Sequence, residues 1–227
     1  MRPLVAIPVY NHARTLRRVV EGVLATGLPA VVVDDGSTDA PLAAVSDLPV
    51  ATLRLEQNQG KGAALLAAAT WAAERGHEAL VTLDADGQHD PGDLPRILAA
   101  AAADWPCLVV GVRRMDGPAV PFSSRFGRRF SNFWIGLETG TWLADTQSGF
   151  RLYPVAALTG PRYWSRRFTF EAEVLVRAVW AGFPVREVSV GVDYAPEGGR
   201  VSHFHKFRDN VRLTVLHTAL LVQRLFR

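Results

Sequence analysis

Residues 79–86 are ALVTLDAD, a short apolar run that ends in two carboxylates separated by one alanine. A run of four to eight apolar residues bounded by polar ones is typical of a buried strand. Two other stretches repeat this design, residues 4–11 (LVAIPVYN) and residues 30–35 (AVVVDD). Polar groups therefore follow three predicted strands at the point where each strand ends.

Helix-like segments separate the predicted strands. Residues 14–26 carry apolar side chains at helical spacing, residues 60–75 are rich in Ala and Leu, and residues 91–103 begin with a proline. Residues 50–55 and 107–112 supply two further strands. Apolar strands that alternate with helices indicate a mostly parallel sheet covered on both faces, and ligands bind beyond the carboxyl ends of such strands.

The second half of the chain is less regular. Residues 122–137 and 169–181 predict helices, residues 184–194 alternate as a strand does, and residues 208–226 predict a C-terminal amphipathic helix. We expect residues 1–227 to form one domain.

The charged residues are divided unevenly along the chain. Residues 1–112 contain 8 Lys and Arg and 13 Asp and Glu, whereas residues 113–227 contain 17 and 9. Such asymmetry indicates a charged or membrane-associated partner, and a genome rich in arginine codons is the alternative explanation. Because the acidic residues gather at strand ends, we do not expect nucleic-acid binding.

Other features exclude several classes of protein. The single cysteine, Cys107, excludes a disulfide framework and a cysteine-based zinc cluster. No apolar run is long enough to span a membrane, and the N-terminus lacks the features of a signal peptide. We therefore expect a cytoplasmic protein, with peripheral contact to the cytoplasmic face of a membrane as a further option.

Asp84 and Asp86 offer hard oxygen ligands at a bend that follows a buried strand. Such ligands suit Mg²⁺ or Mn²⁺, and the side-chain amide of Gln88 can add a third oxygen. A metal there would neutralise a diphosphate leaving group. Paired carboxylates are also common in solvated acidic turns, and that alternative stays open.

Two more loops suit a nucleotide. Asp34 and Asp35 can accept hydrogen bonds from a base or a ribose, although a simple polar turn has the same composition. Residues 58–62 (NQGKG), which include Lys61, precede a helix whose N-terminus attracts phosphate. This loop is not a P-loop, because Gly62 stands where Ser or Thr is required.

Five motifs occur in order along the chain, namely PVYN (8–11), VDDGSTD (33–39), NQGKGAA (58–64), DADGQHDP (84–91) and DTQSGFRLYP (145–154). In these motifs the sequence resembles a family 2 glycosyltransferase of the GT-A fold, near the dolichol-phosphate mannose synthase-like branch. The resemblance implies an α/β fold with three α/β/α layers, a mostly parallel central sheet and a Rossmann-like nucleotide-binding half. Residues 1–112 would then bind the nucleotide-sugar and the metal, and residues 113–227 the acceptor.

The resemblance also implies roles for single residues. It implies that the nucleotide base and ribose contact Pro8, Tyr10, Asn11, Asp34 and Asp35. It implies a divalent metal, Mg²⁺ or Mn²⁺, on Asp84, Asp86 and Gln88. It places the phosphate of an acceptor lipid at Arg113, Arg125 and Arg129. The family usually has Glu where this chain has His12, which leaves the donor base open.

Two further basic residues fit the same site. Lys61, in the glycine-containing loop, is suited to the nucleotide diphosphate. Arg200 follows Gly198 and Gly199, as in a mobile flap that closes over a diphosphate. The helix over residues 122–137 alternates Phe and Arg, which suits an amphipathic acceptor or, alternatively, a Phe stripe packed on the sheet.

Asp86 and Asp145 are the catalytic candidates, Asp86 through its metal. Asp145 can serve as general base for a hydroxyl acceptor, as can Glu171 or Glu173, which nothing in the sequence distinguishes. A phosphate acceptor needs no base, and Asp145 would then orient Arg151 or cap a turn.

The sequence thus predicts an inverting, metal-dependent glycosyltransferase. It would move a sugar from a nucleotide-diphospho-sugar, with uracil or guanine as base, to a lipid-linked acceptor such as a polyprenyl phosphate. Three alternatives stay open: a hydroxyl acceptor on another lipid or a polysaccharide, a nucleotide-sugar-binding subunit without activity, and a phosphohydrolase that uses residues 84–87 (DADG) as a DxDG signature.

Overall fold

The computed structural model describes residues 1–114, 122–193 and 206–226, without the side chains of residues 122–126 and 206–210. Its strands are β1 (Pro3–Val9), β2 (Ala30–Asp34), β3 (Ala51–Arg54), β4 (Ala79–Thr82), β5 (Leu108–Arg113), β6 (Arg151–Pro154) and β7 (Val185–Val190). Its α-helices are α1 (Ala13–Ala25), α2 (Lys61–Glu74), α3 (Leu94–Ala102), α4 (Phe122–Thr139), α5 (Val155–Thr159), α6 (Phe170–Trp180) and α7 (Lys206–Leu225).

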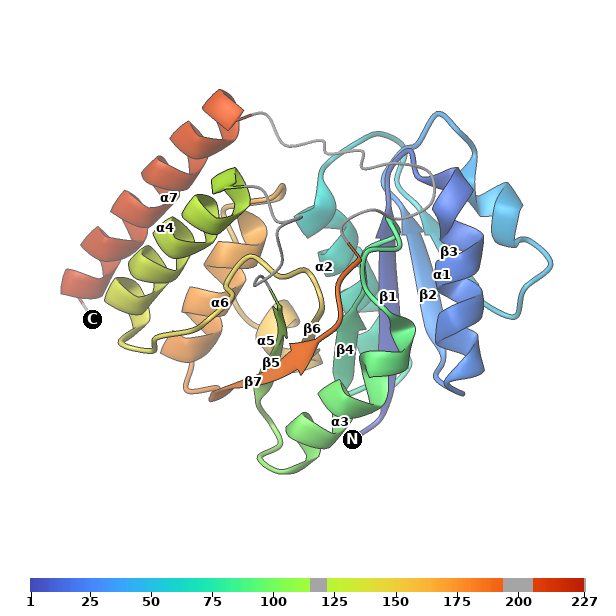
Figure 1. Cartoon of the computed structure of the whole chain (residues 1–227), viewed down its shortest axis with the longest axis horizontal. Coiled ribbons are helices and arrows are strands. Elements are labelled where there is room, and N and C mark those ends of the chain that lie inside the picture. Colours follow the sequence, from blue (N-terminus) through green and yellow to red (C-terminus); the bar gives the residue numbers. More distant parts are fainter. Residues whose placement is uncertain (115–121, 194–205, 227) are drawn as a thin grey trace.

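The strands form one seven-stranded sheet in the order β3-β2-β1-β4-β6-β5-β7 (Figure 1). Strands β1 to β4 run parallel to one another, and β5 runs parallel to β7. The short strand β6 lies between β4 and β5 and runs antiparallel to both. The predicted mostly parallel α/β sheet is therefore confirmed, with one reversed strand inside it.

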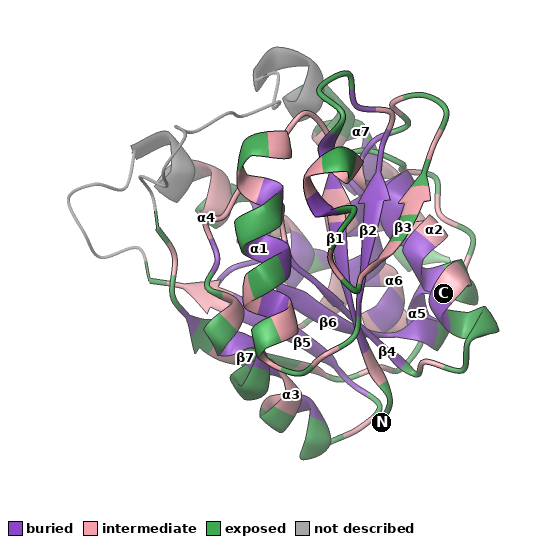
Figure 2. Ribbon diagram, turned by 90° about the vertical axis from the view of Figure 1, so that its right-hand side faces the viewer, coloured by how far each residue is buried: buried purple, intermediate pink, exposed green. Residues whose placement is uncertain are grey.

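Helices cover both faces of the sheet, as the continuous apolar runs predict. Val5 and Ile7 of β1 pack in a core with α1 and α3, whereas Leu4 and Ala6 pack on the opposite face with α2, α5 and α6. Figure 2 shows the central strands buried between these layers. A strand that is buried on both faces has no solvent-facing side, which is why these runs show no polar alternation.

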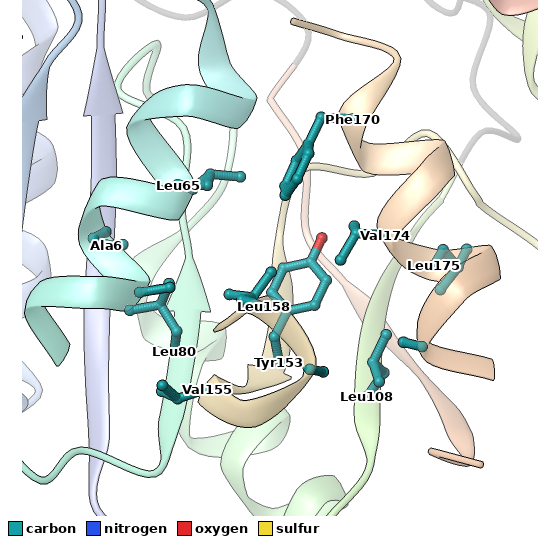
Figure 3. Close-up of a cluster of buried hydrophobic side chains, with 14 of the residues drawn as sticks. Ala6, Leu65, Leu80, Leu108, Tyr153, Val155, Leu158, Phe170, Val174 and Leu175 are labelled. Atoms are coloured by element: carbon teal, nitrogen blue, oxygen red, sulfur yellow. The ribbon is translucent and has the colours of Figure 1, made fainter. Parts of the chain in front are cut away.

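The sequence pattern predicts no strand over residues 151–154. This segment, Arg-Leu-Tyr-Pro, contains a charge and a proline, yet all four residues are buried in the structure. Tyr153 lies among apolar side chains that include Leu158 and Val174 (Figure 3). Tertiary pairing with β4 and β5 therefore makes this segment a strand in spite of its composition.

The predicted helix over residues 91–103 begins as a different kind of turn. Residues Pro91–Asp93 form a 3₁₀ helix, and the side chain of Asp90 accepts a hydrogen bond from the backbone N–H of Gly92. The α-helix α3 begins only at Leu94. The 3₁₀ turn begins at Pro91, the last residue of the motif that contains Asp84 and Asp86, so it fixes where that loop ends.

Helices α4 and α7 lie side by side outside α6 (Figure 1). A buried side-chain hydrogen bond joins them, since Nδ1 of His217 lies 2.7 Å from Oε1 of Glu138. The ring of Trp134 stacks on His217 at 5.8 Å, and the indole N–H of Trp180 donates to the backbone carbonyl of Glu138. These contacts attach α7 to the rest of the molecule.

The Phe stripe of α4 does not pack on the sheet where its side chains are described. Phe130, Phe133 and Leu137 are 39%, 51% and 40% exposed, respectively. Among the residues that the structure describes, no helix has the length and apolar character needed to span a bilayer.

Substitution of Leu80 tests whether the sheet is buried by helices on both of its faces. Leu80 is fully buried in β4, so Leu80→Ala should lower the free energy of unfolding by about 2–5 kcal/mol through lost burial and a residual cavity. Urea denaturation followed by circular dichroism measures the change. Leu225→Ala is the control, because Leu225 is 82% exposed and should change stability little. Equal effects of the two substitutions would contradict the core assignment.

Candidate functional site

The predicted polar residues meet at one edge of the sheet. The carboxyl ends of β1, β2, β4 and β5 lie there because these strands are parallel or share the same direction around β6. Since β6 is reversed, the loop that precedes it, residues 145–150, reaches the same edge. Asp84, Asp145 and Lys61 therefore come from distant parts of the sequence to one place.

Asn11 follows β1 and braces the neighbouring loop. Its backbone has φ of 55°, its N–H donates to Oγ of Ser37 at 3.0 Å, and its side-chain oxygen accepts the backbone N–H of Thr38 at 2.9 Å. Pro8 is part of β1 itself, and Tyr10 follows that strand directly. These residues thus lie at the edge of the sheet where the sequence predicts the nucleotide base.

Asp34 and Asp35 have different environments. Oδ1 of Asp34 accepts the backbone N–H of Ser37, while its buried Oδ2 has no hydrogen bond and lies 3.2 Å from Nη1 of Arg54. Asp35 accepts the backbone N–H groups of Gln59 and Gly60, both at 2.8 Å. Burial raises the pKa of Asp35 in spite of these two bonds. Asp35 therefore holds the loop that begins α2.

That loop places Lys61 between two carboxylates. Its ammonium lies 2.6 Å from Oδ1 of Asp84 and 2.9 Å from Oε1 of Glu171, a residue of α6. Burial lowers the pKa of Lys61, but the two carboxylates outweigh burial and raise it above its ordinary value. Burial likewise raises the pKa of Asp84, but the charge and hydrogen bond of Lys61, together with other nearby positive charges, outweigh burial and lower it. Lys61 and Asp84 are therefore both ionised at neutral pH.

A glycine allows this close approach. A Cβ on Gly149 would lie 2.3 Å from Oδ2 of Asp84 and 2.6 Å from the ammonium of Lys61. Gly149 precedes β6, so the backbone of that loop forms one wall of the ion-pair site.

The predicted metal ligands have suitable chemistry for a hard divalent cation. Oδ1 of Asp86 accepts the backbone N–H of Gln88 at 3.0 Å, which folds the motif back on itself beside Asp84. Among the described residues, no group of three or more His, Cys, Asp and Glu could hold a metal. The predicted set has only two carboxylates, with an amide as third donor. A cation already lies on Asp84, in the form of Lys61, which shows that this carboxylate accepts positive charge.

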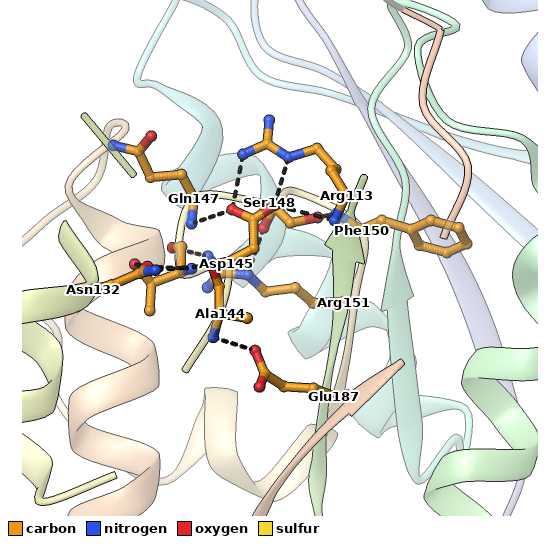
Figure 4. A network of polar contacts seen from close by, with 10 residues as sticks. Arg113, Asn132, Ala144, Asp145, Gln147, Ser148, Phe150, Arg151 and Glu187 are labelled. Atoms are coloured by element: carbon orange, nitrogen blue, oxygen red, sulfur yellow. Dashed lines mark hydrogen bonds and ion pairs between the residues drawn. The ribbon is translucent and has the colours of Figure 1, made fainter. Parts of the chain in front are cut away.

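On the other side of the edge, Arg113 and Asp145 form a bidentate ion pair (Figure 4). Nε and Nη2 of Arg113 donate to the two carboxylate oxygens at 2.8 and 2.9 Å, and its backbone N–H donates at 3.2 Å. Burial raises the pKa of Asp145, but the bonds from Arg113 outweigh burial and lower it. Asp145 thus orients Arg113. Its described hydrogen bonds come from Arg113 and from the backbone N–H of Gln147 in its own turn, and none comes from Arg151.

Arg151 organises the loop from inside the protein. Its guanidinium is fully buried and donates to the backbone carbonyls of Ser148, Thr146 and Glu171 and to the hydroxyl of Tyr153. Asn132 of α4 adds two bonds to Thr146. These bonds connect the loop 145–150 with β6, α4 and α6.

The other arginines predicted to bind the acceptor lack described contacts that place them at the site, unlike Arg113. Arg129 lies exposed on α4. The side chain of Arg125 and the whole of Arg200 fall outside the described residues. Of the four arginines, Arg113 is the one whose described contacts place it in the site.

The sequence offers Glu171 and Glu173 without distinguishing them, and it does not single out His89. Glu171 and Glu173 lie two residues apart, yet Glu171 contacts Lys61 whereas Glu173 is fully buried against Arg177 and two backbone N–H groups. His89, also buried, packs on Phe150 and has an unpartnered Nδ1. Glu171 and Glu173 both lie in the first turn of α6, and their spacing in the sequence does not indicate which of the two faces the site.

Comparisons with known proteins agree with this geometry. The family model for glycosyl transferase family 2 matches residues 4–159. The undecaprenyl-phosphate mannosyltransferase of Micrococcus luteus is 32% identical over 84% of this chain and 83% of its own length. The polyprenol monophosphomannose synthase of Mycolicibacterium smegmatis is 33% identical over 83% of this chain and 76% of its own.

Solved structures show the same fold at lower sequence identity. Glucosyl-3-phosphoglycerate synthase of Mycobacterium tuberculosis, solved with Mn²⁺ and uridine diphosphate, has a TM-score of 0.70 at 18% identity and covers 98% of this chain and 79% of its own. Mannosyl-3-phosphoglycerate synthase of Rubrobacter xylanophilus has a TM-score of 0.73 at 16% identity over 99% and 74%. The α/β fold of the GT-A type is thereby confirmed.

The ion pair between Arg113 and Asp145 should give a pH-dependent stability. Because the pKa of Asp145 is lowered on folding, the pair stabilises the protein above about pH 4 and loses this effect as pH falls below that value. Asp145→Asn should lower the free energy of unfolding by about 2 kcal/mol at pH 7. The difference from wild type should shrink in acid.

Urea titrations at several pH values measure this difference. Asp47→Asn is the control, since Asp47 pairs with Arg17 at the exposed surface and should change stability little. A difference for Asp145→Asn that grows as pH falls would contradict the assigned direction.

Proposed function

The chain belongs to glycosyl transferase family 2, and we propose that this glycosyltransferase moves a sugar from a nucleotide-diphospho-sugar to a polyprenyl phosphate. One observation carries the proposal. Asp84, the first residue of the donor motif, lies 2.6 Å from Lys61 and against Gly149, and the loop of Gly149 also carries Asp145, which holds Arg113. The donor side and a phosphate-binding group therefore meet at one edge of the sheet. The names of the two polyprenyl-phosphate mannosyltransferases support the acceptor class.

The two halves of the chain take different substrates in this proposal. Residues 1–112 bind the donor, whose base lies over the ends of β1 and β2, and residues 113–227 bind the acceptor. The nucleotide-binding set stays as the sequence predicts it. Family membership excludes the phosphohydrolase alternative.

We propose that Asp84, Asp86 and Gln88 hold Mg²⁺ or Mn²⁺. When bound, the metal neutralises the developing charge of the diphosphate leaving group. The oxygen-rich donor set supports this assignment, as does the positive charge that Asp84 already binds. The related fold of glucosyl-3-phosphoglycerate synthase was solved with Mn²⁺.

Arg113 binds the acceptor phosphate in this proposal. A guanidinium held by one carboxylate still presents donors to a second anion, and Asp145 fixes its orientation. An acceptor phosphate oxygen attacks the anomeric carbon from the face opposite the diphosphate, the bond from that carbon to the diphosphate oxygen breaks, and the nucleoside diphosphate leaves. The anomeric configuration is inverted. An anionic oxygen needs no base, so Asp145 as general base stays a prediction for hydroxyl acceptors.

The acceptor lipid requires access to a membrane surface, and α4 and α7 offer one. Their described side chains include exposed Phe133, Val215 and Val222, and exposed Trp142 follows α4. Arg129, Arg212 and Arg224 are exposed on the same two helices, whereas their one described acidic side chain, Glu138, is buried. Exposed aromatic and apolar groups beside arginines suit an anionic lipid surface. We propose peripheral attachment through these two helices.

Asp86→Asn tests the donor site. Loss of a metal-binding carboxylate should reduce transfer to polyprenyl phosphate by at least about a hundredfold and abolish metal-dependent binding of nucleoside diphosphate. Radiolabel transfer and calorimetry measure the two effects. Asp90→Asn, in the same loop, is the control, because Asn can retain the cap on Gly92 and activity. Full activity of Asp86→Asn would refute the metal site.

The double variant Phe133→Ser and Trp142→Ser tests membrane attachment. It should bind phosphatidylglycerol vesicles about tenfold more weakly than wild type, because two exposed aromatic side chains no longer enter the interface. Cosedimentation measures binding, with phosphatidylcholine vesicles for comparison. Trp164→Ser is the control, since Trp164 is 57% exposed in the segment before α6. An equal loss in both variants would count against attachment through α4 and α7.

A further inference from the structure

We propose that Lys61 is an internal counter-cation that occupies Asp84 until the donor diphosphate draws it away, so that the divalent metal binds tightly only together with nucleotide. This inference rests on the proposed metal site. It makes tight binding of the metal depend on the nucleotide, because in the free protein the ammonium of Lys61 already occupies Asp84, a carboxylate that the metal needs.

The geometry of Lys61 leads to this role. Its ammonium lies 2.6 Å from Asp84 and 2.9 Å from Glu171, and its side chain is only 13% exposed. A surface lysine would be hydrated and mobile, whereas this one is held on both sides by charge-assisted contacts. In the free protein, the negative charge of the Asp84 carboxylate is therefore already balanced by the ammonium of Lys61.

A metal ion cannot simply join this arrangement. The backbone at Gly149 closes one side of the ion pair so tightly that a single Cβ there would overlap both Asp84 and Lys61. A divalent cation that approaches Asp84 would also meet the positive charge of Lys61 in a poorly solvated site, where such repulsion is strong. Lys61 must leave Asp84 before the metal can use that oxygen.

The donor diphosphate supplies the reason for Lys61 to move. Lys61 is the first residue of α2, and helix N-termini attract phosphate. The loop before it is fixed by Asp35, which accepts two backbone N–H groups there, so the movement is confined to the lysine side chain. A diphosphate brings more than one negative charge, which can attract the ammonium and the metal together.

Glu171 keeps Lys61 in the site during this exchange. It comes from α6 in the second half of the chain, and its contact with Lys61 does not involve Asp84. Once Asp84 is released, the ammonium therefore remains paired on one side. Glu171 is a positioning residue, and its removal should leave Lys61 bound more exclusively to Asp84.

Direct Mn²⁺ binding tests the proposal without an activity assay. Electron paramagnetic resonance counts free Mn²⁺ in titrations of the full chain, first alone and then with uridine or guanosine diphosphate. Wild type should bind Mn²⁺ weakly alone and much more tightly with the matching nucleotide. Lys61→Gln should bind Mn²⁺ alone at least about tenfold more tightly than wild type and lose most of the gain from nucleotide.

Two further variants fix the interpretation. Lys61→Arg keeps the positive charge and should resemble wild type, whereas Glu171→Gln should weaken binding of Mn²⁺ alone, opposite in sign to Lys61→Gln. Thermal melting identifies any variant that fails to fold. Unchanged or weaker binding of Mn²⁺ alone by folded Lys61→Gln overturns the counter-cation role.

The same titrations distinguish failure of the proposed metal site from failure of the counter-cation role. If wild type and all variants fail to bind Mn²⁺ with either nucleotide, the metal site itself is refuted. If wild type binds Mn²⁺ equally well with and without nucleotide, the metal site stands and only the counter-cation role fails.

Discussion

The candidate site depends on the hydrogen bonds that the buried guanidinium of Arg151 donates. Burying a charge is costly unless it is hydrogen-bonded, and all three guanidinium nitrogens of Arg151 donate, to backbone carbonyls of its own loop and of α6 and to the hydroxyl of Tyr153. These bonds fix the loop 145–150 in space. Asp145 and Gly149 lie in that loop, so the orientation of Arg113 and the wall beside Lys61 both follow from one buried side chain.

The uneven charge distribution has its counterpart at the site. Lys61 is one of the few cations of the acidic first half, and its partner Glu171 comes from the basic second half. Arg113 pairs with Asp145, an acid within the basic half. Residues of minority charge in each half thus gather where the two substrates would meet. Codon usage still explains why the chain contains far more arginine than lysine. It does not explain why these oppositely charged residues lie beside one another at the candidate site.

Some residues that the motifs assign to ligands also hold the protein together. Asn11 and Asp35 make their described hydrogen bonds to neighbouring loops, while Oδ2 of Asp34 is left without one. A motif therefore marks two kinds of residue, those that contact a ligand and those that hold a loop in the shape the ligand needs. Sequence spacing cannot separate them, because both kinds are short polar side chains at strand ends.

The amino-acid sequence alone predicts the mostly parallel sheet, its covering helices and the carboxylates at the strand ends, because apolar periodicity and the order of the elements along the chain indicate the fold class. It also placed Asp84, Asp86 and Asp145 in motifs. The three-dimensional fold makes residues 151–154 a reversed strand between β4 and β5, which brings the loop before it to Asp84. It likewise decided that Glu171, and not Glu173, faces Lys61. These outcomes depend on pairing between segments far apart in the chain, and no local pattern records such pairing.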